Sequence, residues 1–83
     1  MKAVVYLRPA AKVLAKLPAD VRRRIMAKLE AYAADPAAVA GSVKQMQGID
    51  AMRLRIDDYR AIFRVVGDRI EVAKIGHRRE IYD

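Results

Sequence analysis

The spacing of hydrophobic positions changes once along the chain, near residue 51. Before that point, after a short apolar run at residues 4–7, apolar side chains recur every three or four positions, which is typical of amphipathic helices. Beyond it, apolar and polar residues alternate, which is typical of strands with one buried face. The predicted order is therefore a strand, two helices and then a set of strands.

The first half of the chain predicts one short strand and two helices. The strand covers Val4 to Leu7, and the first helix covers residues 10–17. Pro18 separates this helix from a second, stronger one, which should end near Asp35-Pro36 because the residue before a proline avoids helical backbone angles. Residues 37–50 carry no clear pattern, and we expect a connection there with at most a short extra turn.

The second half predicts three strands joined by two-residue turns at Asp57-Asp58 and Gly67-Asp68. The last strand should cover residues 69–75 and end at Gly76. The fold class is α+β, with an N-terminal strand and two helices packed on one face of a mostly antiparallel sheet that a C-terminal three-stranded meander completes. We expect all 83 residues to form a single domain.

The alternation gathers arginines on the sheet face that points away from the predicted core, which we call the arginine face. A two-residue loop at Asp57-Asp58 places Arg55 directly opposite Arg60. Opposed like charges in a sheet repel each other, so a purely structural sheet would tend to alternate signs, whereas a face that receives phosphate would collect cations. An ordinary solvated strand face is the alternative. The arginines on this face are Arg53, Arg55, Arg60 and Arg64.

The second turn predicts which other residues share the arginine face. A two-residue turn at Gly67-Asp68 pairs Arg64 with Glu71, and this opposite-charge pair gives Arg64 a structural role outside the predicted site. The same register makes the face partly apolar, because it places three further residues there: Ile62, Ala73 and Ile75.

The net charge of +7 and the isoelectric point of about 10.1 favour a polyanionic partner. Eleven of the 17 basic residues are arginine, which binds phosphate with two parallel hydrogen bonds. Cysteine is absent, histidine occurs once and the acidic residues are scattered, so neither a zinc site nor a two-metal nuclease site is expected, and no cofactor. Without a signal peptide or a membrane span in view, we expect a cytoplasmic protein.

The segment after Gly76 adds three residue types with useful chemistry. His77 can transfer protons near neutral pH, Arg78 can stabilise charge on a phosphate, and Tyr82 can stack on a base of single-stranded RNA. We expect this segment to fold back beside the arginine face. Each residue also has a plain alternative, as a capping histidine, a surface charge or a ring packed against the sheet.

Three stretches, at residues 53–56, 58–65 and 75–82, resemble the C-terminal half of RelE-type toxins of the RelE/ParE toxin–antitoxin superfamily. The predicted N-terminal elements fit the same family, so the resemblance covers nearly the whole chain. It implies a ribosome-dependent endoribonuclease (an mRNA interferase) that cuts mRNA in the A site without metal, by attack of the 2′-hydroxyl on the adjacent phosphate. It also implies a RelB-like antitoxin in a hetero-oligomer, besides the 70S ribosome and mRNA as partners.

The resemblance assigns the activation of the 2′-hydroxyl to the basic residues of one strand. Arg53 and Arg55 stand where relatives carry lysines, and Arg55 is the stronger candidate. Because the pKa of free arginine lies above about 12, a general-base role is hard to justify. Arg55 would then hold the phosphate, with His77 as a rival base.

Three more roles follow from the resemblance by position. Arg60 matches the arginine that stabilises the phosphate. Arg78 matches the arginine that stabilises charge on the leaving oxygen or protonates it. Tyr82 matches the tyrosine that stacks on or orients the cut nucleotide.

Other functions remain open at this stage. The ParE branch of the superfamily has the same fold and poisons DNA gyrase, although it generally lacks the full set of arginines and the tyrosine. A non-catalytic toxin could occupy the ribosome or RNA without cutting. A membrane-surface role is disfavoured, because the helix that carries Arg22-Arg23-Arg24 needs its apolar face for the core.

Overall fold

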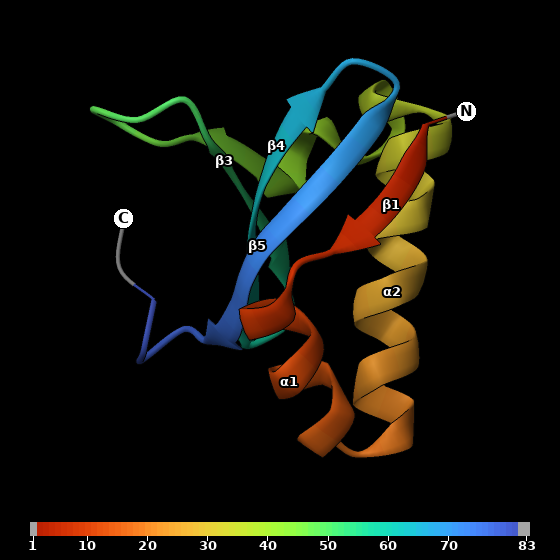
Figure 1. The fold of residues 1–83 in the computed structure, drawn as a ribbon, viewed down its shortest axis with the longest axis vertical. Helices are drawn as coiled ribbons and strands as arrows, with labels where there is room; N and C mark the ends of the chain where they lie inside the picture. The colour runs from red at the N-terminus through yellow and green to blue at the C-terminus, as the bar shows by residue number, and fades with distance from the viewer. Residues whose placement is uncertain (1, 82–83) are drawn as a thin grey trace.

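The structure, a computed structural model, describes residues 2–81 as a mixed sheet with helices on one side (Figure 1). The helices within this range are α1 (Arg8–Lys16), α2 (Ala19–Ala34) and the 3-10 helix η1 (Pro36–Ser42). The strands are β1 (Ala3–Tyr6), β2 (Val43–Gln45), β3 (Met52–Ile56), β4 (Tyr59–Val66) and β5 (Arg69–His77).

The sheet has the strand order β1-β5-β4-β3-β2. β1 runs parallel to β5, and the other neighbours are antiparallel. The first strand thus lies beside the last strand in the sheet. Both α-helices follow β1 in the chain and lie on the same side of the sheet (Figure 1). The predicted α+β fold class is confirmed.

The core forms where the helices meet the sheet. Phe63 of β4 is completely buried, and its ring meets that of Tyr32 edge-on at a centroid distance of 4.9 Å. Removing such buried apolar side chains from water is the main stabilising contribution in a domain of this size. The buried residues of this cluster are Ala10, Leu14, Ile25, Leu29, Ala33, Leu54, Ile56, Ala61, Phe63, Ile70, Val72 and Ile75.

The segment predicted as a connection contains two further elements, so that prediction is wrong in part. Residues 36–42 form η1, and residues 43–45 form β2, which extends the sheet by pairing with β3. Two bonds to the carbonyl of Ala51 close the β2–β3 loop, one from the Gln45 side chain (3.1 Å) and one from the Met46 backbone N–H (3.0 Å). Three residues are too few for an alternating pattern to show.

Both predicted turns are confirmed, together with the pairings derived from them. Ile56 pairs with Tyr59 and Arg55 with Arg60 around the first turn, where Asp57 takes a positive φ of 53°. Such left-handed backbone is more tolerable for Asp than for most residues. Across the second turn, Arg64 stands opposite Glu71 in the strand register, but the Glu71 carboxylate forms its ion pair with Arg69 at 2.9 Å.

A bulge in β5 changes the register beyond that point. Phe63 pairs with Val72 but Ile62 pairs with Lys74, which leaves Ala73 as the extra residue. The sides of the strand are exchanged after it, so Ile75 is buried in the core and Lys74 lies on the arginine face. The prediction that Ile75 lies on the arginine face is therefore wrong.

Two element ends also differ from the prediction. β5 continues to His77, because Gly76 still pairs with Arg60, rather than ending before this glycine. The first helix begins at Arg8, two positions before the predicted start, with proline in its first turn, where the absent N–H has no helical partner to lose. In the described part of the chain, no helix is both long and apolar enough to cross a bilayer.

Candidate functional site

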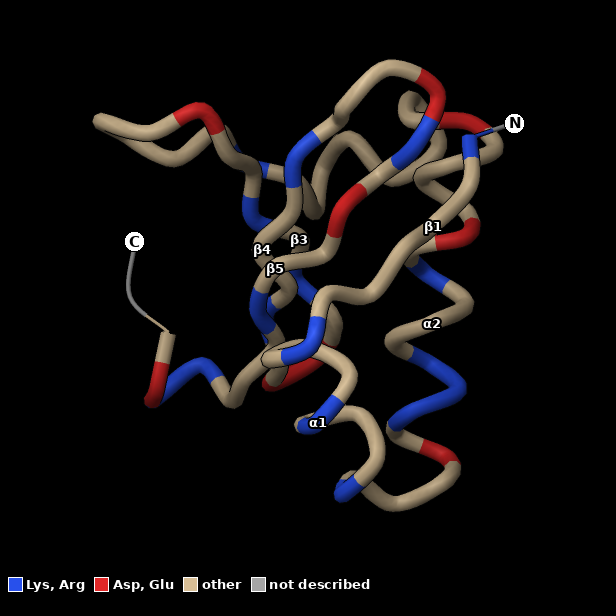
Figure 2. Tube along the Cα trace, viewed as in Figure 1, with Lys and Arg blue, Asp and Glu red and all other residues tan. Residues whose placement is uncertain are grey.

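The arginine face lies on the side of the sheet away from the helix-covered core and carries two adjacent rows of basic residues. Figure 2 marks where lysine and arginine occur along the chain. In one row Arg55 pairs with Arg60, and in the next Lys44 pairs with Arg53. Lys74 continues the second row on the far side of Ile62. Neighbouring strands are about 4.8 Å apart, so Lys44, Arg53, Arg55 and Arg60 are neighbours on one positive surface, from which Ile62 separates Lys74.

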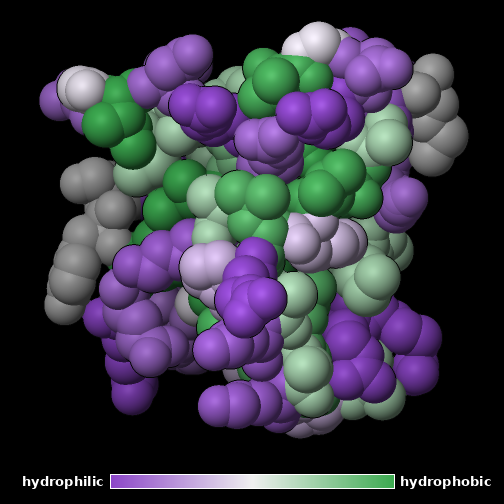
Figure 3. Space-filling view, viewed as in Figure 1, coloured by the Kyte–Doolittle hydropathy of each residue, from purple (hydrophilic) through white to green (hydrophobic). Residues whose placement is uncertain are grey.

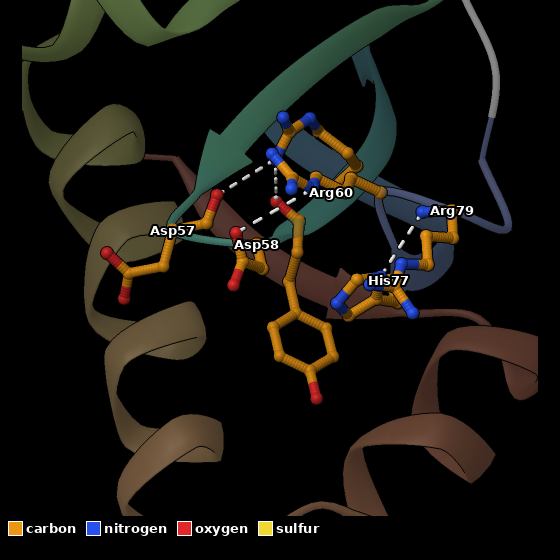
Figure 4. A network of polar contacts seen from close by, with 7 residues as sticks. Asp57, Asp58, Arg60, His77 and Arg79 are labelled. Atoms are coloured by element: carbon orange, nitrogen blue, oxygen red, sulfur yellow. Dashed lines mark hydrogen bonds and ion pairs between the residues drawn. The ribbon is translucent and has the colours of Figure 1, made fainter.

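Arg60 is held to the β3–β4 turn by two hydrogen bonds. Its Nη1 donates to the carbonyl oxygens of Asp57 (3.0 Å) and Tyr59 (2.9 Å), which fixes the guanidinium beside the β3–β4 turn (Figure 4). The side chain is partly buried against the sheet. A fixed guanidinium can receive a phosphate without losing further side-chain freedom on binding.

The electrostatic surroundings single out Arg60 as well. Its pKa is lowered, first by burial and then by the positive charges of Arg53, Arg55 and Arg78. Asp58 opposes this effect. A guanidinium nevertheless stays protonated at neutral pH, so Asp58 offsets the repulsion among these cations only in part and a bound anion would reduce it further. The cations around Arg60 make this part of the surface a candidate phosphate site.

Arg78 joins the same turn from the end of β5. Its backbone N–H donates to the carbonyl of Asp58 at 2.7 Å (Figure 4), and its Nε lies 3.8 Å from Oδ1 of that aspartate. Both side chains are more than half exposed, so this ion pair is weak and a phosphate can replace it. The β3–β4 turn thus holds Arg60 and Arg78 together.

His77 lies on the opposite side of the sheet. It pairs with Tyr59, and the two rings meet edge-on at 5.6 Å on the side where Ile75 is buried. Its Nδ1 accepts a hydrogen bond from the backbone N–H of Arg79 at 3.2 Å (Figure 4). The structure does not bring this imidazole together with Arg55, and the histidine instead organises the turn that follows β5.

Gly76 allows the chain after β5 to return over the sheet. A Cβ atom at this position would lie 3.1 Å from the side chain of Ile81, which is only 4% exposed. The Ile81 side chain therefore packs directly on Gly76, and this contact holds the turn that carries Arg78 against the sheet. Tyr82, the predicted stacking residue, lies outside the described residues.

Sequence analysis missed three residues that the structure adds to this region. Lys44 was missed because β2 is too short to be predicted, and Lys74 because of the bulge. Asp58 was treated only as a turn residue, although its place between two arginine-bearing strands was a usable signal. Residues 2–81 contain no cluster of three or more histidine, cysteine or acidic side chains that could hold a metal ion. The chemistry available here is phosphate binding and charge stabilisation by guanidinium groups.

Comparisons with known proteins relate the chain to toxins. Residues 4–82 match the family described as the ParE toxin of the type II toxin–antitoxin system parDE. No curated protein matches the sequence.

Solved structures of RelE toxins share the fold. The chain resembles one from the RelB–RelE antitoxin–toxin complex of Methanococcus jannaschii, with 26% identity over 95% of both chains and a TM-score of 0.74. The RelE–RelB complex of Pyrococcus horikoshii OT3 gives 24% identity, 96% and 98% coverage and a TM-score of 0.78. The intact Escherichia coli RelBE complex gives 20% identity, 93% and 96% coverage and a TM-score of 0.74.

Proposed function

The chain belongs to the ParE toxin family of type II toxin–antitoxin systems, and so to the RelE/ParE superfamily; from this premise we propose that it is a ribosome-dependent endoribonuclease that cuts mRNA in the A site. The observation that carries the proposal is the gathering of Arg53, Arg55 and Arg78 around a fixed Arg60. Such a set matches the charge that develops on a phosphate during RNA cleavage.

The reaction needs no co-reactant besides the RNA, because the nucleophile is the 2′-hydroxyl of the RNA itself. The 2′-oxygen attacks the adjacent phosphorus and the bond from phosphorus to the 5′-oxygen breaks, which leaves a 2′,3′-cyclic phosphate and a 5′-hydroxyl. The proton of the 2′-hydroxyl passes to solvent, and a proton from solvent reaches the 5′-oxygen. Arg60 binds the phosphate, and Arg55, directly opposite, stabilises the developing 2′-oxyanion. Arg78 neutralises the leaving oxygen, and Tyr82 stacks on the cut nucleotide.

This assignment gives His77 a different role from that of a base. The imidazole faces Tyr59 on the helix side, whereas the arginines lie on the other side. His77 then positions Arg78 through the turn that its Nδ1 helps to fasten.

A cognate antitoxin is the proposed partner in the cytoplasm, in a hetero-oligomer that keeps the toxin inactive. RelE from Methanococcus jannaschii was solved together with RelB. On this chain, the edge strand β1 exposes Val5 (39%), and Leu7, which follows the strand, is 37% exposed. Hydrophobic surface also crosses the middle of the face where β1 and β5 run (Figure 3), which suits a protein partner.

Primer extension on a defined mRNA tests the activity, with and without programmed 70S ribosomes that have an empty A site. We expect cleavage at the A-site codon only when ribosomes are present, and a loss of about 100-fold or more in the Arg78→Ala variant. Arg79→Ala is the matched control, because it removes the neighbouring exposed arginine. Full activity in Arg78→Ala would contradict the assignment of the site.

The second candidate is poisoning of DNA gyrase, which the ParE description of the matched family favours. A protein that arrests growth but cuts no mRNA under either condition would support it. In that case a supercoiling assay with purified gyrase should show inhibition by the wild-type chain. Inhibition that persists in Arg78→Ala would separate this function from the arginine site.

A further inference from the structure

A hollow of about 290 Å³ opens on the arginine face beside the β2–β3 loop. This volume is at the lower end of the range of about 300–1,000 Å³ for small-ligand pockets, so it suits a single planar group better than an extended ligand. The loop projects from the side of the sheet away from α2 (Figure 1). The lining residues are Lys44, Gln45, Met46, Gln47 and Arg53.

The lining combines the three kinds of group that recognise a nucleobase. Lys44 and Arg53 supply positive charge for an adjoining phosphate. Met46 supplies a polarisable thioether for the face of a ring. Gln47 is exposed and offers both donors and an acceptor, which can read the polar edge of a base.

The backbone around the hollow is held in place before any ligand arrives. The Gln45 side chain and the Met46 backbone N–H both bond to the carbonyl of Ala51, so the two ends of the loop are tied together. Gly48 turns the loop at a φ of 80°, a left-handed value that favours glycine. A pocket that is already formed loses less ordering free energy on binding.

The hollow lies about one nucleotide spacing from the candidate phosphate site. Arg53 lies two residues along β3 from Arg55, which corresponds to about 6.8 Å. This distance is comparable with the spacing of successive nucleotides in an extended single strand. An RNA that places one phosphate on Arg55 and Arg60 would therefore bring its next nucleotide to Arg53.

We propose that this hollow, at the β2–β3 loop, is a subsite for the nucleobase of the mRNA nucleotide next to the one that is cut, and that Gln47 reads the edge of this base. The inference rests on the proposed function, because it takes the cut phosphate to lie on Arg55 and Arg60. The proposal assigns codon preference to Gln47, a residue separate from the arginines that stabilise charge on the phosphate.

The first test is a binding experiment that needs no cleavage. The full chain is titrated with the four nucleoside 5′-monophosphates and with ribose 5-phosphate, and NMR follows the Met46 methyl group and the side-chain amides of Gln45 and Gln47. Nucleotides should shift these signals, and ribose 5-phosphate should leave them largely unchanged. Equal shifts with both ligands would overturn the subsite whether or not the protein cuts RNA.

The second test measures cleavage rates on ribosomes programmed with A-site codons that differ at every position. Gln47→Ala, and Gln47→Glu, which keeps the size but removes the donors, should change the relative rates at one codon position by about 10-fold or more, the usual range for a side chain that reads a base with two bonds. Ile49→Ala is the control, because it lies in the same loop outside the lining.

The outcomes separate the subsite from the activity. A loss of rate in the Gln47 variants that is confined to codons with the preferred base, with rates on the other codons retained, supports the subsite. A uniform loss at all codons overturns it, because it would mean that the loop contacts ribosomal RNA or the backbone alone. If the wild-type chain cuts nothing, the proposed function fails, and the NMR titration still decides whether the hollow takes a base.

Discussion

Arg60 combines two properties that are seldom found together in a surface arginine. Its guanidinium is tied to the carbonyls of Asp57 and Tyr59, and it faces other cations at close quarters. The hydrogen bonds fix the position of the guanidinium. The positive charges around it favour the binding of an anion. The repulsion depends on positive charge alone, whereas the hydrogen bonds to the turn depend on the guanidinium.

A lysine at this position should therefore not suffice. Arg60→Lys keeps the charge but loses the planar group that bonds to the turn and to phosphate at once. We expect the rate of ribosome-dependent cleavage to fall at least 10-fold, with little change in the melting temperature. Arg64→Lys, on the same strand and face but paired with Glu71, should stay within about two-fold of the wild type. Equal losses in both variants would argue against a special role for Arg60.

Tyr6 illustrates a residue whose contribution is to stability. Within the described residues its buried hydroxyl has no hydrogen-bond partner. Burial raises its pKa to about 12, and the negative charge of Glu30 adds to the effect. Below pH 10 the tyrosine is neutral in the folded and unfolded chains and contributes no pH dependence. Between pH 10 and 12 the unfolded chain loses the proton first, so stability falls as the pH rises.

Tyr6→Phe should remove that part of the alkaline destabilisation. At pH 7 the free energy of unfolding should change by no more than about 1 kcal/mol, because no hydrogen bond is lost. Between pH 9 and pH 11 the variant should lose less stability than the wild type, as measured by urea unfolding at each pH. An identical loss in both proteins would show that the Tyr6 hydroxyl is not protected from ionisation by the fold.

At the scale of elements, the β3–β4 turn and the return of the chain over Gly76 build the site together. The turn supplies the bonds to Arg60 and Arg78, and the contact between Gly76 and Ile81 fastens the segment that carries Arg78. Neither element is part of the helix-covered core. Damage here should therefore affect activity more than folding.

Gly76→Val tests this separation. The new side chain would meet Ile81, and the end of the chain would have to move away from the sheet, taking Arg78 with it. We expect cleavage to fall by about 10-fold or more, as is usual when a reacting group is displaced, while a cooperative unfolding transition persists. The matched change is Gly41→Val, where a Cβ would meet nothing within 4 Å, and its activity should be unchanged. Equal activities in the two variants would show that the return of the chain does not position Arg78.

The elements also show what the sequence could predict. The pairing of Arg55 with Arg60 followed from alternation and from a two-residue turn, since both depend only on neighbours in the chain. The place of Lys74 did not, because a bulge at Ala73 reverses the sides of a strand without a distinctive local pattern. β2 was missed for a related reason, since three residues become a strand only through their partner.

For the molecule as a whole, the position of His77 shows the same limit. The sequence placed this histidine beside the arginines because the segment after Gly76 was expected to fold back beside the arginine face. In the folded chain the bulge in β5 and the continuation of the strand put the imidazole on the helix side. Residues that are close in the sequence can thus lie on opposite faces of a sheet. The register of the whole sheet therefore determines which basic side chains become neighbours.

The most direct test of the account is the chemistry of the cut ends. Programmed 70S ribosomes with an empty A site are treated with wild type, Arg60→Ala or Arg64→Ala, and the fragment ends are identified by mass spectrometry. The account predicts a 2′,3′-cyclic phosphate and a 5′-hydroxyl at the A-site codon, at wild-type rate in Arg64→Ala and about 100-fold more slowly in Arg60→Ala. Ends with a 5′-phosphate, or equal rates in Arg60→Ala and the wild type, would contradict it.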